Sequence, residues 1–192
     1  MEHFYHNIHG FFDFQELYTR IVKELSDGSH FVEIGAFYGK SSAYMAVELA
    51  NSCKKIKFDV IDTWRGSPEH QIDGWDKQEM MINDTAFDAF QQNMLPAKGY
   101  YNPIKLSSME ASKLYQDGSL DFVFIDADHS YDAVKTDVET WLPKIKKDGY
   151  IGGHDYTELW NAPSPNGVKE YIDSKFPNSF ERIGNSWLHK VV

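Results

Sequence analysis

The sequence has little cysteine and no long apolar run. Cys53 is the single cysteine among 192 residues, which excludes an internal disulfide and a metal cluster of several thiolates. No run reaches the 18 apolar residues that a transmembrane helix needs. Residues 1–10 carry Glu2 and three histidines, whereas a signal peptide has a basic and then an apolar stretch. We therefore expect a cytoplasmic protein with no membrane partner.

Positive charge is also scarce. Lysine and arginine number 19 against 29 acidic residues, giving a formal net charge of −10. Nucleic acids are bound largely through basic surfaces, so we expect no nucleic-acid partner. A chain of this length with 42% hydrophobic residues can bury one core without disulfide or metal support. The sequence thus predicts one domain over residues 1–192.

Short apolar runs alternate with helical patterns along the chain. Helical spacing over 14–25, after Asp13 as a possible N-cap, places a helix in the N-terminal region 1–28. A closing hairpin is expected around Gly184-Asn185. Five earlier strands are expected at 31–36, 57–62, 102–106, 120–126 and 149–153, and a short helix at 111–115. This order predicts a Rossmann-like, doubly wound α/β fold with a seven-stranded, mostly parallel sheet and a C-terminal antiparallel hairpin.

Residues 63–84 interrupt this alternation with an irregular insertion. Long insertions in compact domains are usually functional, and this one follows a strand at the edge where such sheets bind ligands. It fits an acceptor site for a sugar or phenol, or a contact in a homo-oligomer. Its aromatic and hydrogen-bonding side chains are Trp64, Arg65, Glu69, His70, Trp75 and Asp76.

A glycine segment, Glu33 to Ser41, lies where the first expected strand passes into a helix. Backbone amides at such a point bind negatively charged ligand groups. A phosphate-binding P-loop needs four residues between its glycines, but only three separate Gly35 and Gly39. A dinucleotide fingerprint needs a second glycine where Phe37 stands. With these two motifs excluded, the segment is described by the pattern Glu-x-Gly-x-x-x-Gly, a turn between a strand and a helix.

This turn resembles the first motif of the class I S-adenosylmethionine-dependent methyltransferases. Asp62 ends the second expected strand 27 residues after Gly35, where a carboxylate can accept both ribose hydroxyls of adenosine. Ser108 and Met109 match the place where the family contacts adenine, although serines before a helix are also ordinary caps. The resemblance implies S-adenosylmethionine contacts from Glu33, Gly35, Ala36, Phe37, Gly39, Ser41, Asp62, Thr63, Trp64, Ser108, Met109 and Asp126.

Acidic residues end two further strands that are expected to be neighbours. Asp126 follows one, and His154-Asp155 follows the next. Carboxylates crowded at one sheet edge repel each other unless they share a cation or a proton. The pattern resembles the metal-dependent O-methyltransferases of sugar hydroxyls and catechols. That resemblance implies Asp126, His154 and Asp155 as ligands of a divalent cation, Mg or Mn. Asp126 and His129 are the expected catalytic residues, and His129 is near enough in sequence to act as general base or as a further ligand.

Two alternatives remain for these acidic residues and for the activity. Asp126 could orient the cofactor amine while His154 is a hydrogen-bonded core residue without metal. The imidazole favours Mn, Fe or Zn over Mg. The chain also resembles methyltransferase-like hydroxylase components of cephalosporin biosynthesis, which would bind S-adenosylmethionine without transfer. The sequence favours methylation of a small-molecule hydroxyl, and Phe37 argues against a third class, the nicotinamide-dependent dehydrogenases.

Overall fold

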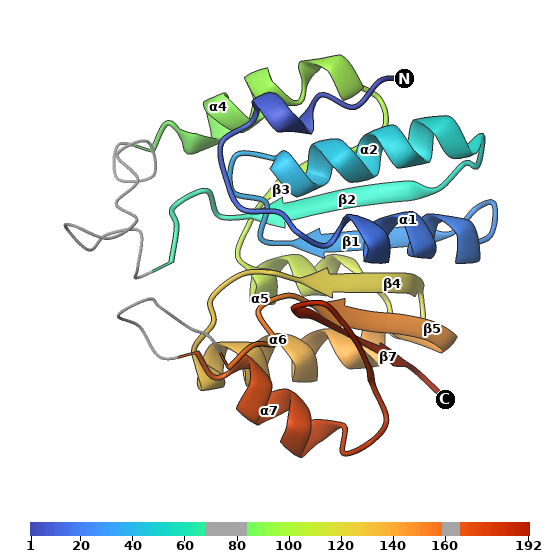
Figure 1. Cartoon of the computed structure of the whole chain (residues 1–192), viewed down its shortest axis with the longest axis vertical. Helices are drawn as coiled ribbons and strands as arrows, with labels where there is room; N and C mark the ends of the chain where they lie inside the picture. Colours follow the sequence, from blue (N-terminus) through green and yellow to red (C-terminus); the bar gives the residue numbers. More distant parts are fainter. Residues whose placement is uncertain (68–83, 159–165) are drawn as a thin grey trace.

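The computed structural model describes residues 1–67, 84–158 and 166–192, whose strands form one seven-stranded sheet in the order β3-β2-β1-β4-β5-β7-β6 (Figure 1). β1 to β5 pair in parallel, and β7 runs antiparallel to both β5 and β6. The predicted fold class, hairpin included, is confirmed. The strands are β1 (His30–Ile34), β2 (Lys57–Asp62), β3 (Asn102–Lys105), β4 (Leu120–Ile125), β5 (Ile145–Gly153), β6 (Glu181–Ile183) and β7 (Ser186–Lys190).

Helices cover both faces of the sheet. The α-helices are α1 (Gln15–Glu24), α2 (Lys40–Ser52), α4 (Ala86–Asn93), α5 (Ser108–Ala111), α6 (Tyr131–Trp141) and α7 (Val168–Lys175). Short 3₁₀ turns are η1 (Tyr5–Asn7), η3 (Leu95–Ala97), η4 (Ser112–Leu114) and η5 (Leu142–Lys144). None of the helices in the described ranges is long and apolar enough to cross a lipid bilayer.

Alternating strand residues divide the core into two layers. In β4, Phe122 and Phe124 pack with α1, α2 and α4, whereas Val123 and Ile125 pack with α5, α6 and α7. This is the period-2 alternation of a strand that is buried on both faces. Every β4 residue except Asp121 is buried, which matches the apolar run that predicted this strand.

Three local expectations differ from the structure. Phe14, not Asp13, is the N-cap of α1, because the Asp13 carboxylate bonds to His154 and Asn185 instead. β5 begins at Ile145 rather than residue 149, since Ile145 already pairs with Leu120. The helix expected at 111–115 is α5 followed by η4, and it begins earlier because Ser107 makes a capping box with Glu110. Within the insertion, Glu69, His70, Trp75 and Asp76 lie outside the described residues.

Candidate functional site

The glycine turn after β1 brings the ends of two strands together. Gly35 has a φ of +86°, and a Cβ built on it would lie 1.8 Å from the backbone carbonyl oxygen of Asp126. Any side chain here would collide with the end of β4, so only glycine permits this approach. Phe37 follows in the left-handed region with a φ of 50°, and Gly39, the N-cap of α2, has a φ of 90°.

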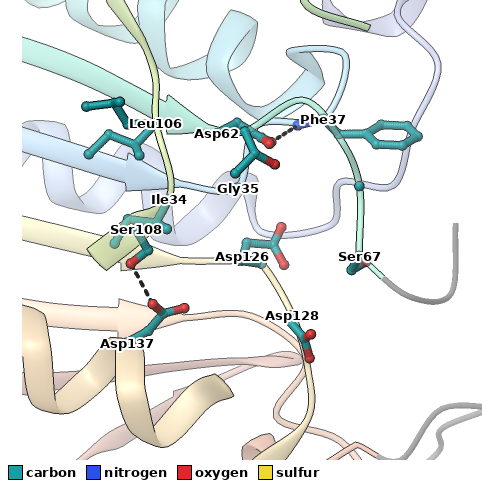
Figure 2. Close-up of a pocket in the computed structure, with 14 residues that line it drawn as sticks. Ile34, Gly35, Phe37, Asp62, Ser67, Leu106, Ser108, Asp126, Asp128 and Asp137 are labelled. Carbon is teal, nitrogen blue, oxygen red and sulfur yellow. Dashed lines mark hydrogen bonds between the residues drawn. The ribbon is translucent and has the colours of Figure 1, made fainter. Parts of the chain in front are cut away.

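Asp62, at the end of β2, holds this turn in place. Its Oδ2 accepts hydrogen bonds from the backbone amides of Ala36 at 2.8 Å and Phe37 at 3.0 Å, and the latter contact is drawn in Figure 2. Its Oδ1 accepts one from the Trp64 amide at 2.7 Å. A carboxylate oxygen can accept two hydrogen bonds, so Oδ1 has capacity for one ligand hydroxyl. Asp62 therefore orders the turn and remains able to bind a ribose.

A pocket of about 260 Å³ opens beside Asp62 at the carboxyl edge of the sheet (Figure 2). Six of the sequence-predicted cofactor residues line it: Gly35, Phe37, Asp62, Thr63, Ser108 and Asp126. The sequence interpretation missed the other lining residues, which are Ile34, Ile61, Gly66, Ser67, Leu106, Ala127, Asp128 and Asp137. The pocket thus combines apolar side chains with carboxylates, a lining that can hold the base and the sugar of a nucleoside.

Glu33 lies beneath the glycine turn rather than in this pocket. Its side chain is fully buried, where its oxygens accept hydrogen bonds from the hydroxyls of Tyr18, at 2.7 Å, and Ser42. Burial raises the pKa of Glu33 to about 7, although these hydroxyl donors oppose the shift. Through Ser42, Glu33 holds the first turn of α2 against β1. Any effect on the cofactor is therefore indirect.

Other predicted cofactor residues also lie away from the pocket lining. The Trp64 side chain is fully buried against Phe87 and Phe90, and its Nε1 donates to the Phe37 carbonyl at 2.9 Å. Met109 is exposed and accepts a hydrogen bond from Thr140. Three more predicted residues lie outside the lining: the Ala36 amide donates to Asp62, Gly39 is the N-cap of α2, and Ser41 is buried.

The acidic residues after β4 and β5 converge as the sequence pattern indicated. One ligand atom from each of Asp126, His154 and Asp155 lies within 4.8 Å of the others. The Nδ1 of His154 is 3.2 Å from Asp155 Oδ2 and 3.7 Å from Asp126 Oδ1. His129, from the loop after β4, places its Nε2 2.9 Å from Asp155 Oδ2. One imidazole nitrogen and two carboxylate oxygens are a donor set that fits a divalent transition metal such as Mn²⁺.

The other nitrogen of His154 faces a residue from the N-terminal segment. Nε2 lies 2.6 Å from Asp13 Oδ1, and Asn185 donates to Asp13 Oδ2 at 3.1 Å. Burial alone would lower the pKa of His154, but hydrogen bonds to Asp126, Asp13 and Asp155 outweigh it and raise the pKa to about 12. The imidazolium therefore balances the surrounding carboxylates. Without a cation, a proton on His154 stabilises the cluster.

All the predicted site residues fall within one recognisable family segment. The family model described as "Methyltransferase domain" matches residues 32–156, which is more than half of the chain. The chain belongs to this methyltransferase family. Membership implies S-adenosylmethionine as the methyl donor, and the matched segment of the methyltransferase contains the glycine turn, Asp62 and the acidic cluster.

The curated proteins include a relative of much greater length. The methyltransferase is 27% identical over 130 residues to an uncharacterised protein, y4gI, of Sinorhizobium fredii. The match covers 65% of this chain and 13% of y4gI. The chain thus spans only a small part of that relative.

Solved structures with low sequence identity share the fold. The O-methyltransferase NovP has a TM-score of 0.60 at 16% identity, covering 93% of this chain and 79% of NovP. Cofactor-bound Rv0187 from MTB has a TM-score of 0.61 at 12% identity, covering 92% of this chain and 78% of Rv0187. A Staphylococcus aureus protein provisionally assigned as a caffeoyl-CoA O-methyltransferase has a TM-score of 0.61 at 15% identity. The match covers 97% of this chain and 86% of that protein. At these identities the comparison establishes the fold alone.

Proposed function

We propose that the methyltransferase transfers a methyl group from S-adenosylmethionine to a hydroxyl oxygen of a small molecule of sugar or phenol type, assisted by a divalent cation. One observation carries the proposal: Asp126 both lines the nucleoside pocket and belongs to the three-residue cluster. A bound cation and the methyl donor would then lie on either side of Asp126 and close to each other. NovP, which has the same fold, is an O-methyltransferase.

Asp126, His154 and Asp155 would hold the cation, with Mn preferred to Mg because of the imidazole. When bound, a divalent cation lowers the pKa of a coordinated hydroxyl. His129, whose Nε2 lies 2.9 Å from Asp155 Oδ2, would take the proton of that hydroxyl as a general base. The acceptor oxygen then bonds to the methyl carbon as the carbon–sulfur bond breaks, and the electron pair passes to sulfur.

A transfer assay tests this proposal. Purified protein is incubated with S-adenosylmethionine labelled on its methyl group and a panel of catechols, phenols and sugars, with Mn²⁺, Mg²⁺ or EDTA. We expect labelled product with Mn²⁺, a loss in EDTA and a loss in Asp155→Asn. His129→Gln should lower kcat by about 100-fold or more, whereas His6→Gln, at an exposed histidine, should not.

Two results would contradict parts of the proposal. Equal transfer in EDTA and with Mn²⁺ would remove the cation from the mechanism and leave His154 as a structural residue. Binding of S-adenosylmethionine with no transfer to any hydroxyl acceptor would favour a protein that binds the cofactor without transfer. The panel therefore distinguishes the two functions that the sequence left open.

A further inference from the structure

A buried carboxylate in the nucleoside pocket has no role in the reaction proposed above. Asp137 of α6 lines the pocket, and 7% of its surface is exposed. Its Oδ1 accepts a hydrogen bond from the Ser108 hydroxyl at 2.5 Å, and Trp141 Nε1 donates to the same hydroxyl at 2.8 Å. Figure 2 shows Ser108 and Asp137 facing each other on one side of the pocket. The two hydrogen bonds that run from Trp141 through Ser108 to Asp137 fix the orientation of the Asp137 carboxyl group.

The Asp137 carboxyl has no cation partner among the described residues. Ser108 is its only hydrogen-bond donor there, and the charged group that acts on its pKa is another acid, Asp128. Burial raises the pKa of Asp137 to about 6, while the Ser108 bond opposes the shift. Oδ2 of Asp137 is not among the buried atoms without a partner, so it is accessible from the pocket that Asp137 lines and can accept a hydrogen bond from a ligand.

The rest of the pocket indicates which ligand group supplies that donor. Asp62, also in the lining, suits one ribose hydroxyl, and Ile34, Leu106 and Ala127 offer apolar surface for a flat base. We propose that Asp137 accepts a hydrogen bond from the exocyclic amine of the adenine of S-adenosylmethionine and thereby selects 6-aminopurines over 6-oxopurines. The inference rests on the proposed use of S-adenosylmethionine. It assigns the base specificity to α6.

A purely structural Asp137 would behave differently. Its bond to Ser108 joins α5 to α6, so a structural role predicts that substitution lowers stability and affects all ligands alike. A specificity role predicts an effect that depends on the group at position 6 of the purine. An oxo group would place an acceptor opposite the carboxyl oxygen, and a site built for a donor strongly rejects such an analogue.

Calorimetric titration with three product analogues separates these roles. The probes are S-adenosylhomocysteine, S-inosylhomocysteine with a 6-oxo group, and the analogue with hydrogen at position 6. We expect the wild type to bind the 6-amino compound at least about tenfold more tightly than either other compound. Asp137→Asn presents an amide N–H and should lower the 6-amino to 6-oxo affinity ratio by at least about tenfold.

The control is Asp132→Asn, an exposed aspartate on the same helix, which should keep the wild-type ratio. Because each ratio compares two ligands on one variant, partial unfolding does not change it. An unchanged ratio in Asp137→Asn with tight S-adenosylhomocysteine binding by the wild type would overturn the inference and leave the proposed function standing. No binding of any of the three compounds by the wild type would overturn both.

Discussion

The Nε2 atom of His154 lies 2.6 Å from Oδ1 of Asp13, across 141 residues of sequence. This contact links the segment before α1 to the end of β5. When one ring nitrogen of a histidine binds a metal, a carboxylate hydrogen-bonded to the other ring nitrogen fixes the orientation of the ring and makes the histidine a stronger ligand. Asp13 would have that role if Nδ1 of His154 faces a cation with Asp126 and Asp155.

The Asp13 contact predicts a change in metal affinity. Asp13→Asn should weaken Mn²⁺ binding by about tenfold, because loss of such an outer partner costs 10- to 100-fold and Asp13 is itself exposed. Asn185→Ala, which removes only the bond to Asp13, should have a smaller effect. Titration followed by Mn²⁺ electron paramagnetic resonance measures both. An affinity in Asp13→Asn equal to that of the exposed control Asp117→Asn would contradict this role.

Substitution of Gly35 should destabilise the fold more than substitution of Gly28, which serves as the control. Gly35→Ala places a Cβ 1.8 Å from the Asp126 carbonyl oxygen and should destabilise the fold by about 3 kcal/mol or more. Gly28 has a similar φ of +82°, but a Cβ added there would meet nothing within 4 Å. Gly28→Ala should therefore cost only about 1–2 kcal/mol. Urea unfolding measures both, and equal losses would show that the strand approach is unimportant.

Glu33 predicts a pH-dependent stability difference. Its pKa of about 7 in the folded state exceeds the ordinary 4.5, so the stability it contributes is present below pH 4.5 and is lost as pH rises through 7. Glu33→Gln does not titrate. The stability of the wild type relative to Glu33→Gln should thus fall by about 3 kcal/mol between pH 4 and pH 8.

Urea unfolding in EDTA across this pH range measures the Glu33 effect. Glu16→Gln, at an exposed glutamate on α1, is the matched control. A wild-type minus Glu33→Gln difference that stays constant with pH would show that folding does not raise the pKa of Glu33.

Local patterns in the sequence predicted the features that depend on neighbouring residues. β2 has the expected bounds, and Asp126, His154 and Asp155 meet because parallel strands end at one edge of the sheet. The burial of β4 on both faces likewise follows from its apolar run.

Features that depend on packing between distant segments were not predicted. Asp13 has the sequence features of an N-cap, and its pairing with His154 requires the path of the whole N-terminal segment. Asp137 has the spacing of an ordinary helix residue, and burial against Ser108 reveals its place in the pocket. Trp64 follows Asp62 closely, yet its ring packs into the core rather than lining the pocket, because Phe87 and Phe90 surround it.

Calorimetric titration of the metal-free protein with S-adenosylmethionine tests whether the pocket beside Asp62 binds this cofactor. The wild type should bind with one site, and Asp62→Ala should lose at least about 100-fold in affinity, because it removes the ribose acceptor and three hydrogen bonds that order the glycine turn. Asp117→Asn should bind as the wild type does. Absence of S-adenosylmethionine binding by the folded wild type, with or without Mn²⁺, would contradict the account.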